Sequence, residues 1–218
     1  MKRESIFKAI VQIIIIILSG NLCKAEYDVY SLGVSYTVDC EYIQSFADAA
    51  GINLKAGSCY TGNMRSQARA SMDQEPYSEL SSGTVDAFIM TAQMPYKYTE
   101  PESEACIKMS KVLLENNPEA RIYIHDYWTV VRPSSLALYT YLHGWDNVNA
   151  HHLGGIKTIS LMANELKHKV YNIPVGIAIQ LLREKIEQNE LERYKNTDEL
   201  LVDSLNLSEI GRYVQACM

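Results

Sequence analysis

Val85-Asp86-Ala87-Phe88-Ile89-Met90-Thr91 is the stretch of this 218-residue sequence that decides the fold class. It is a short and nearly continuous apolar run. Such a run is typical of a strand at the centre of a parallel sheet, where both faces are buried. We therefore predict a central β-strand over residues 85–91.

Strands and helices are expected to alternate on both sides of this run. Residues 40–50 and 102–116 repeat apolar residues at helical spacing and end at helix stop signals, Gly51 and Pro118. Further strands are expected at 29–32, 52–54, 121–124 and 170–173, and further helices at 63–72, 151–169, 175–188 and from about Ser208. Such alternation implies βαβ units with right-handed crossovers. The sequence therefore predicts an α/β fold with a parallel sheet covered by helices on both faces.

Composition excludes several classes of protein. The chain has 47% hydrophobic and 21% charged residues, which is too apolar for disorder and too mixed for a multi-span membrane protein. Its formal net charge is −6, and no block of Lys and Arg follows residue 3. Nucleic-acid binding needs a basic face, so we expect no nucleic-acid partner. We expect one compact domain.

The N-terminus has the features of a secretory signal peptide over residues 1–25. Lys2 and Arg3 precede a short apolar run, 9–18, and small residues occupy the cleavage positions that end at Ala25. A transmembrane anchor is the alternative, but this run is about half of the roughly 20 apolar residues that a bilayer span requires. We expect cleavage after Ala25, no stable membrane span afterwards, a mature domain of residues 26–218, and a secreted or periplasmic location. The chain stops inside the expected last helix, and we interpret this as a truncation at the C-terminus.

The mature chain would keep four cysteines: Cys40, Cys59, Cys106 and Cys217. An oxidising compartment permits one or two disulfides in three connectivities, and buried free thiols are an equal alternative. No CxxC or Cys/His spacing is present, so we expect no zinc site, and we expect no cofactor.

Polar residues follow several of the expected strands. Sites in open parallel sheets lie at the carboxyl ends of the strands. This rule singles out Ser35, Gly57, the stretch 91–93 and the stretch 125–128. Ser35 lies two residues after Gly33, on a turn between a strand and a helix, where a serine can be a nucleophile or an N-cap.

The two ends of the mature chain resemble those of a known family. Leu32-Gly33-Val34-Ser35-Tyr36-Thr37 lies at the start, and Asp203-Ser204-Leu205-Asn206-Leu207-Ser208-Glu209-Ile210-Gly211 lies at the end. Together they resemble the nucleophile motif and the closing Asp-x-x-His-Leu-Ser-x-x-Gly motif of the SGNH/GDSL hydrolases. The resemblance implies a three-layer α/β/α sandwich of the flavodoxin-like type.

The resemblance also implies roles for individual residues. Ser35 matches the serine that attacks an ester carbonyl, and Asp203 matches the acid that orients the catalytic histidine. Ser35 and Gly57 would bind the oxyanion. The family's Asn donor to the oxyanion has no counterpart here, so Gln93 or Thr91 is a weak substitute.

One departure affects the chemistry directly. Asn206 stands where the family pattern has histidine. An amide has no basic nitrogen, so it cannot take the proton of Ser35 at neutral pH. Removing the base from a serine triad costs very roughly 10⁴ to 10⁶ in rate. His125 is the possible substitute base, because it follows a strand.

Three functions stay open at this stage. The first is an exported esterase that acts on acyl esters, carbohydrate-linked ones above all, with impaired activity. The second is an inactive protein that binds a glycan or another small ligand in the inherited cleft. The third is an exported interaction domain. The sequence does not indicate the oligomeric state.

Overall fold

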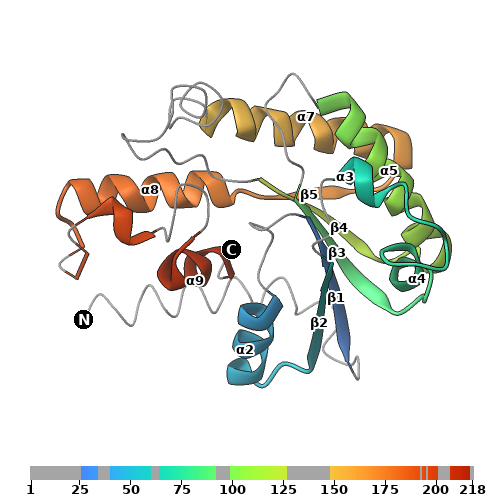
Figure 1. Ribbon diagram of the computed structural model, residues 1–218, viewed down its shortest axis with the longest axis horizontal. Helices are drawn as coiled ribbons and strands as arrows, with labels where there is room; N and C mark the ends of the chain where they lie inside the picture. Colours follow the sequence, from blue (N-terminus) through green and yellow to red (C-terminus); the bar gives the residue numbers. More distant parts are fainter. Residues whose placement is uncertain are drawn as a thin grey trace.

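The computed structural model describes residues 26–33, 40–59, 64–91, 99–126, 148–191, 193–194, 196–200 and 207–216. Five parallel strands form a central sheet in the order β2-β1-β3-β4-β5 (Figure 1). They are β1 (Tyr27–Leu32), β2 (Leu54–Cys59), β3 (Val85–Thr91), β4 (Arg121–His125) and β5 (Val170–Ile173). The predicted α/β class and parallel sheet are confirmed.

The run over residues 85–91 is the middle strand of this sheet. All seven residues of β3 are buried, and β1 and β4 pair with it on its two sides. Phe88 and Met90 belong to one hydrophobic cluster, whereas Ala87 and Ile89 belong to another. This alternation follows from the two-residue period of a strand, which sends successive side chains to opposite faces. A continuous apolar run is therefore the correct signature of its burial.

Helices form a layer on each face of the sheet. One layer contains α3 (Met64–Gln67), α4 (Tyr77–Leu80), α5 (Thr99–Asn116) and α7 (Val148–Leu166). The other contains α2 (Cys40–Ala50), α8 (Val175–Glu187) and α9 (Glu209–Ala216), with the short 3₁₀ helix η4 (Thr197–Leu200) beside α8 and α9 (Figure 1). The layers on the two faces confirm the predicted three-layer sandwich.

Some predicted boundaries are wrong. The second strand was expected at 52–54 with a turn after it, but β2 extends through Cys59. The helix expected over 63–72 is a single turn, α3, and neither α4 nor η4 was predicted. A short edge strand and single helical turns carry little periodic signal, because they contact few core residues.

Among the described residues, one cysteine is identified as a free thiol. This is Cys106, which is buried on α5, and burial raises the pKa of its thiol above the ordinary value. It therefore joins no disulfide, which leaves at most one pair among Cys40, Cys59 and Cys217. None of the described helices has both the length and the apolar character of a bilayer span.

Candidate active site at the carboxyl edge of the sheet

The strand order defines a switch point between β1 and β3. The chain leaves β1 towards β2 on one side of the sheet, whereas β3, β4 and β5 follow on the other side. Ligands of doubly wound sheets bind in the crevice at such a point, beyond the carboxyl ends of the strands. Leu32 pairs with Met90 at these ends, and residues 34–39 follow β1 directly. The predicted nucleophile segment therefore begins at the switch point.

A buried polar cluster lies at the same carboxyl edge, one strand further along. Thr91 ends β3 and His125 ends β4, and the two residues are register partners. Thr91 Oγ1 lies 3.4 Å from His125 Nδ1, and the amide nitrogen of Gln215 on α9 lies 3.0 Å from His125 Nε2. All three side chains are buried. A residue near the C-terminus is thereby connected to the end of a central strand.

The contact with Gln215 fits one tautomer of His125. With the amide nitrogen facing Nε2, Nε2 accepts the hydrogen bond in the tautomer that carries the ring proton on Nδ1. Burial lowers the pKa of His125 from 6.5 to about 3, so the ring is neutral at pH 7. The lone pair that a base would use already faces Gln215. A role as substitute base would require this hydrogen bond to break.

Asp126, the next residue, stabilises the start of α8. Its Oδ1 accepts a hydrogen bond of 3.0 Å from the backbone N–H of Gly176, and its own N–H donates to Ile173. Pro174 precedes α8 and provides no side-chain cap. A carboxylate at a helix N-terminus satisfies a free N–H and faces the positive end of the helix dipole. We therefore assign Asp126 a capping role.

The described half of the closing motif anchors α9. Leu200 and Leu207 are buried in one hydrophobic cluster, and the N–H of Ser208 donates to the carbonyl of Leu200 at 2.9 Å. Ser208 Oγ accepts a hydrogen bond from the N–H of Gly211, as an N-cap does. A Cβ at Gly211 would lie 2.6 Å from the Leu200 carbonyl oxygen. The Leu, Ser and Gly of the motif therefore each have a packing or capping role.

The helices that follow the two predicted motifs contact each other. Phe46 on α2 and Tyr213 on α9 have ring centroids 5.0 Å apart, and Figure 1 shows the two helices side by side. Residues 34–39 directly precede α2, and residues 201–206 directly precede Leu207 and Ser208. The flanks of both motifs therefore lie on one side of the molecule, as a shared site requires.

Four predicted site residues lie outside the described residues: Ser35, Gln93, Asp203 and Asn206. Their roles stay predictions. The structure places the segments on either side of them and brings those flanks together.

Gly57 is inside β2 and does not follow it, so its predicted position is wrong. It pairs with Tyr30 of β1, and a Cβ would lie 3.4 Å from that ring. Gln44 of α2 donates to the carbonyl of Leu54 and accepts from the N–H of Ala56, so these two residues face the free edge of the sheet. Backbone groups alternate along a strand, so the N–H of Gly57 faces β1.

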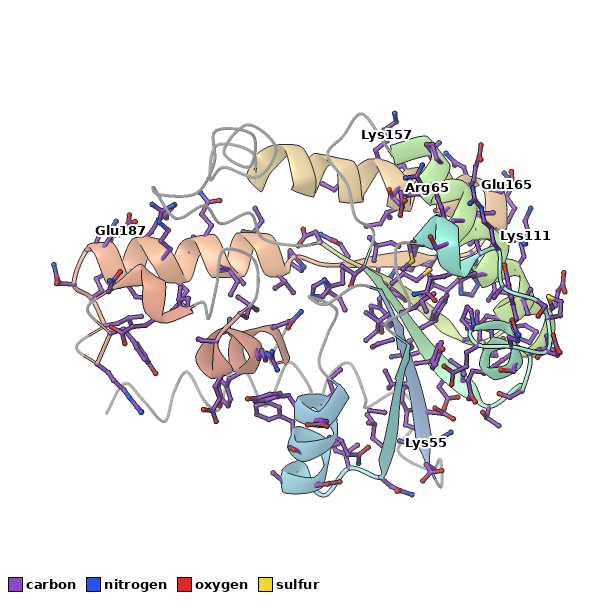
Figure 2. All side chains as sticks on the ribbon, viewed as in Figure 1. Lys55, Arg65, Lys111, Lys157, Glu165 and Glu187 are labelled. Atoms are coloured by element: carbon purple, nitrogen blue, oxygen red, sulfur yellow. The ribbon has the colours of Figure 1, made fainter. Side chains whose placement is uncertain are left out.

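A buried carboxylate connects the helices that follow β2 and β3. Glu102, in the first turn of α5, is 2% exposed and accepts a 3.0 Å hydrogen bond from Nε of Arg65 on α3. The backbone N–H of Met64 also donates to it. Burial raises the pKa of Glu102, and Arg65 opposes that shift. Figure 2 shows Arg65 on α3 beside α5. The pair fixes α3 against α5.

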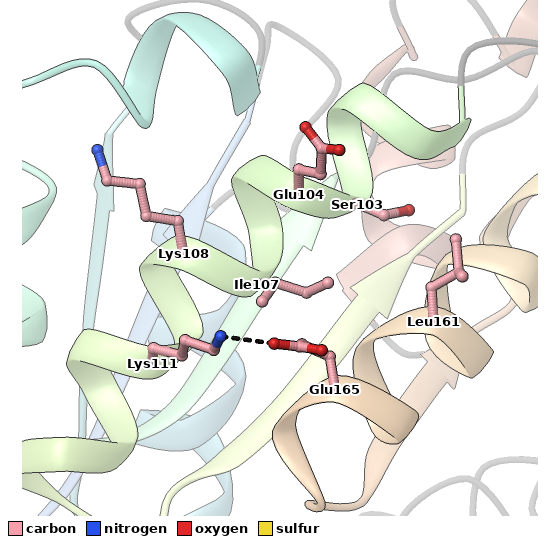
Figure 3. Close-up of a pocket in the computed structure, with 7 residues that line it drawn as sticks. All are labelled: Ser103, Glu104, Ile107, Lys108, Lys111, Leu161 and Glu165. Carbon is pink, nitrogen blue, oxygen red and sulfur yellow. Dashed lines mark hydrogen bonds and ion pairs between the residues drawn. The ribbon is translucent and has the colours of Figure 1, made fainter.

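The described residues also line a groove of about 470 Å³ between α5 and α7. Lys111 Nζ lies 2.7 Å from Glu165 Oε1, and Figure 3 shows the two side chains facing each other across the groove. This groove lies between the helices and not at the switch point. Within the described ranges no group of three His, Cys, Asp or Glu side chains could hold a metal ion.

Sequence reasoning did not identify Gln215. Thr91, His125 and Asp126 carried a signal, because each comes at the end of an apolar strand. Gln215 carried none, since a single glutamine in an eight-residue helix has no pattern that would indicate burial.

Comparison with solved structures supports the fold. A DUF4886 family protein from Bacteroides uniformis superposes with a TM-score of 0.63 at 17% identity, covering 88% of this chain and 80% of its own. A protein described as an SGNH hydrolase from Slackia heliotrinireducens gives 0.58 at 12% identity, covering 88% and 95%. A family 3 carbohydrate esterase from Clostridium thermocellum gives 0.54 at 12% identity, covering 88% and 92%.

No family model matches the chain, and no curated protein matches it. Likeness at these identities shows the fold and does not extend to activity. The strand order and the helix layers agree with that result. This chain adopts the α/β fold of the SGNH/GDSL hydrolases.

Proposed function

We propose that the chain is an exported serine esterase of the SGNH type that acts on acyl esters, with activity limited by Asn206. The observation that carries the proposal is that the flanks of both motifs lie on one side of the molecule, where α2 contacts α9, and that Gln215 on α9 reaches His125 at the carboxyl edge. The contacts of Leu207, Ser208 and Gly211 support it, because they hold the start of α9 against Leu200, the last described residue before the closing segment.

In the proposed reaction the Ser35 oxygen bonds to the ester carbonyl carbon. The hydroxyl proton passes to solvent in the native chain, and the carbonyl π electrons move to oxygen, where the oxyanion needs N–H donors. Collapse of the tetrahedral intermediate breaks the C–O bond and releases the alcohol, and water then hydrolyses the acyl-serine to the free acid. Asn206 cannot accept the hydroxyl proton, so we expect the loss of rate to lie in the proton-transfer step. Because the N–H of Gly57 faces β1, we propose that Gly62, the first glycine after β2, donates to the oxyanion together with the N–H of Ser35.

Hydrolysis of p-nitrophenyl acetate by the full chain tests this proposal. Replacing Asn206 with histidine should raise kcat/KM at least tenfold, because it restores a base beside the proposed nucleophile. Ser35→Ala should abolish that gain. Ser160→Ala is the matched control, since Ser160 is exposed on α7 and bonds only within its helix. No gain in a folded Asn206→His variant would refute the assigned triad.

We propose acetylated carbohydrate as the substrate class. The support is the likeness in fold to a carbohydrate esterase. The Asn206→His variant should release acetate from acetylated xylan faster than it releases p-nitrophenol from p-nitrophenyl butyrate. The reverse preference would assign the site to other acyl esters. Binding of the glycan by the native chain without hydrolysis would instead favour the alternative, an inactive glycan-binding protein, which the amide at residue 206 also fits.

We propose export through residues 1–25, which supplies a secreted or periplasmic location. Expression of the full chain in a bacterial host should yield a protein whose first residue is Glu26. A chain that keeps residue 1 in all fractions would refute cleavage.

A further inference from the structure

We infer that His125 and Gln215 are positioning residues, which hold α9 on the carboxyl edge and thereby fix the point at which the closing segment joins α9. This inference deepens the proposed function and rests on it. The observation behind it is a hydrogen bond of 3.0 Å between two buried side chains that are 90 positions apart.

Burying these polar groups has a cost that apolar side chains would not have. Histidine and glutamine each lose hydration on burial, and a hydrogen bond returns only part of it. What the pair provides is a directional connection, since the bond forms only when α9 has one position and one rotation relative to β4. Apolar contacts alone would allow the helix to slide or rotate.

The position of α9 matters because of what precedes it. Ser208 caps α9, and Leu207 and Leu200 fix the point where the segment 201–206 begins and ends. That segment carries Asp203 and Asn206. A displacement of α9 therefore moves the attachment of both residues, and a shift of about 1 Å at a catalytic group can cost roughly a hundredfold in rate.

Tyr213 extends the connection to the nucleophile side. Its ring packs on Phe46 of α2, the helix that follows residues 34–39. One helix of eight residues thus contacts the strand end at His125 and the helix behind the predicted nucleophile. The His125–Gln215 hydrogen bond is a polar contact between α9 and the end of β4, and its geometry fixes the orientation of α9.

Hydrogen exchange of α9 tests the structural half of the inference without any substrate. Gln215→Leu in the full chain should raise exchange rates across α9 at least tenfold. Gln180→Leu is the matched control, because it removes an exposed glutamine bond on α8, to Glu184. Unchanged exchange in Gln215→Leu would overturn the inference.

Paired substitutions of His125 separate positioning from proton transfer. The side chain of glutamine reaches the place of Nε2 and can accept from Gln215, whereas asparagine is shorter and reaches only the place of Nδ1. Positioning predicts that His125→Gln keeps α9 exchange within threefold of the native rate, while His125→Asn raises it tenfold or more. Neither variant holds a basic nitrogen, so a base at this position would be lost equally in both.

Hydrolysis adds the functional readout, measured in the native and Asn206→His chains. Gln215→Leu should lower kcat at least tenfold and leave KM within threefold. Loss of Ser35-dependent turnover in both His125 variants with unchanged α9 exchange would show that His125 is a base, and would overturn the inference. If no variant hydrolyses esters, the proposed function fails, and the exchange experiment still decides whether the pair holds α9.

Discussion

Acidification should destabilise this protein through His125. The ring is fully buried, and desolvation lowers the pKa of His125 from 6.5 to about 3. Between these two values the unfolded chain binds a proton that the folded chain does not. Stability from this group is therefore complete above pH 6.5 and is lost as the pH falls towards 3.

The size of the effect follows from the shift. Each pH unit below 6.5 should cost about 1.4 kcal/mol of unfolding free energy, until the loss levels off near pH 3. At pH 5 the expected loss is about 2 kcal/mol, which is a large part of the 5–15 kcal/mol that stabilises typical domains. Other groups also contribute to the pH dependence, among them Glu102, whose pKa burial raises, so the measurement must be a difference.

Urea unfolding of the native chain and His125→Gln at pH 8, 7, 6 and 5 provides that difference. The variant lacks the titrating ring and keeps the acceptor for Gln215, so groups common to both chains cancel. The native chain should lose about 2 kcal/mol relative to the variant between pH 8 and pH 5. Parallel stability curves would refute the reasoning, because they would show that the ring is hydrated or charged in the folded state.

Two further predictions concern packing and charge. Gly211→Ala should lower the unfolding free energy by at least about 2 kcal/mol in thermal or urea unfolding, because its Cβ would lie 2.6 Å from a backbone oxygen. Gly155→Ala, whose Cβ would meet only an ordinary contact at 3.6 Å, should be neutral or stabilising by up to about 1 kcal/mol, and equal losses would refute the packing argument. Arg65→Ala should cost about 1–3 kcal/mol, since it leaves the buried Glu102 carboxylate without its charge partner. Lys111→Ala removes an exposed ion pair and should cost less than about 1 kcal/mol, so a larger loss there would refute the role of burial.

The sheet could be predicted from the sequence because its strands carry strong local signals. Residues 85–91 and 170–173 have the predicted bounds, since both are short, mostly apolar runs, and Pro174 directly follows the second. β2 had no such signal. Backbone groups on its outer edge form hydrogen bonds with the side chain of Gln44 on α2. This is a tertiary contact that no short window of sequence contains.

The candidate site was predictable in part for the same reason. Strand ends follow from the apolar runs, so Thr91 and His125 could be placed at the carboxyl edge. The partner of His125 could not be found, because the choice of Gln215 depends on how α9 rotates against the sheet. His125 was predicted as a substitute base only because it follows a strand, and that position gives no information on the hydrogen bond its ring makes with Gln215.

The described residues that follow position 206 have packing and capping roles of their own. Leu207 enters the cluster that α8 and α9 share, Ser208 caps α9, and Gly211 permits the close approach of α9 to residue 200. None of these contacts uses the side chain at position 206. Under the proposed function, a substitution there would change the chemistry available to Ser35 without removing any of these anchoring contacts. For that reason Asn206→His is expected to fold as the native chain does, and its activity tests the placement of the triad rather than the stability of the protein.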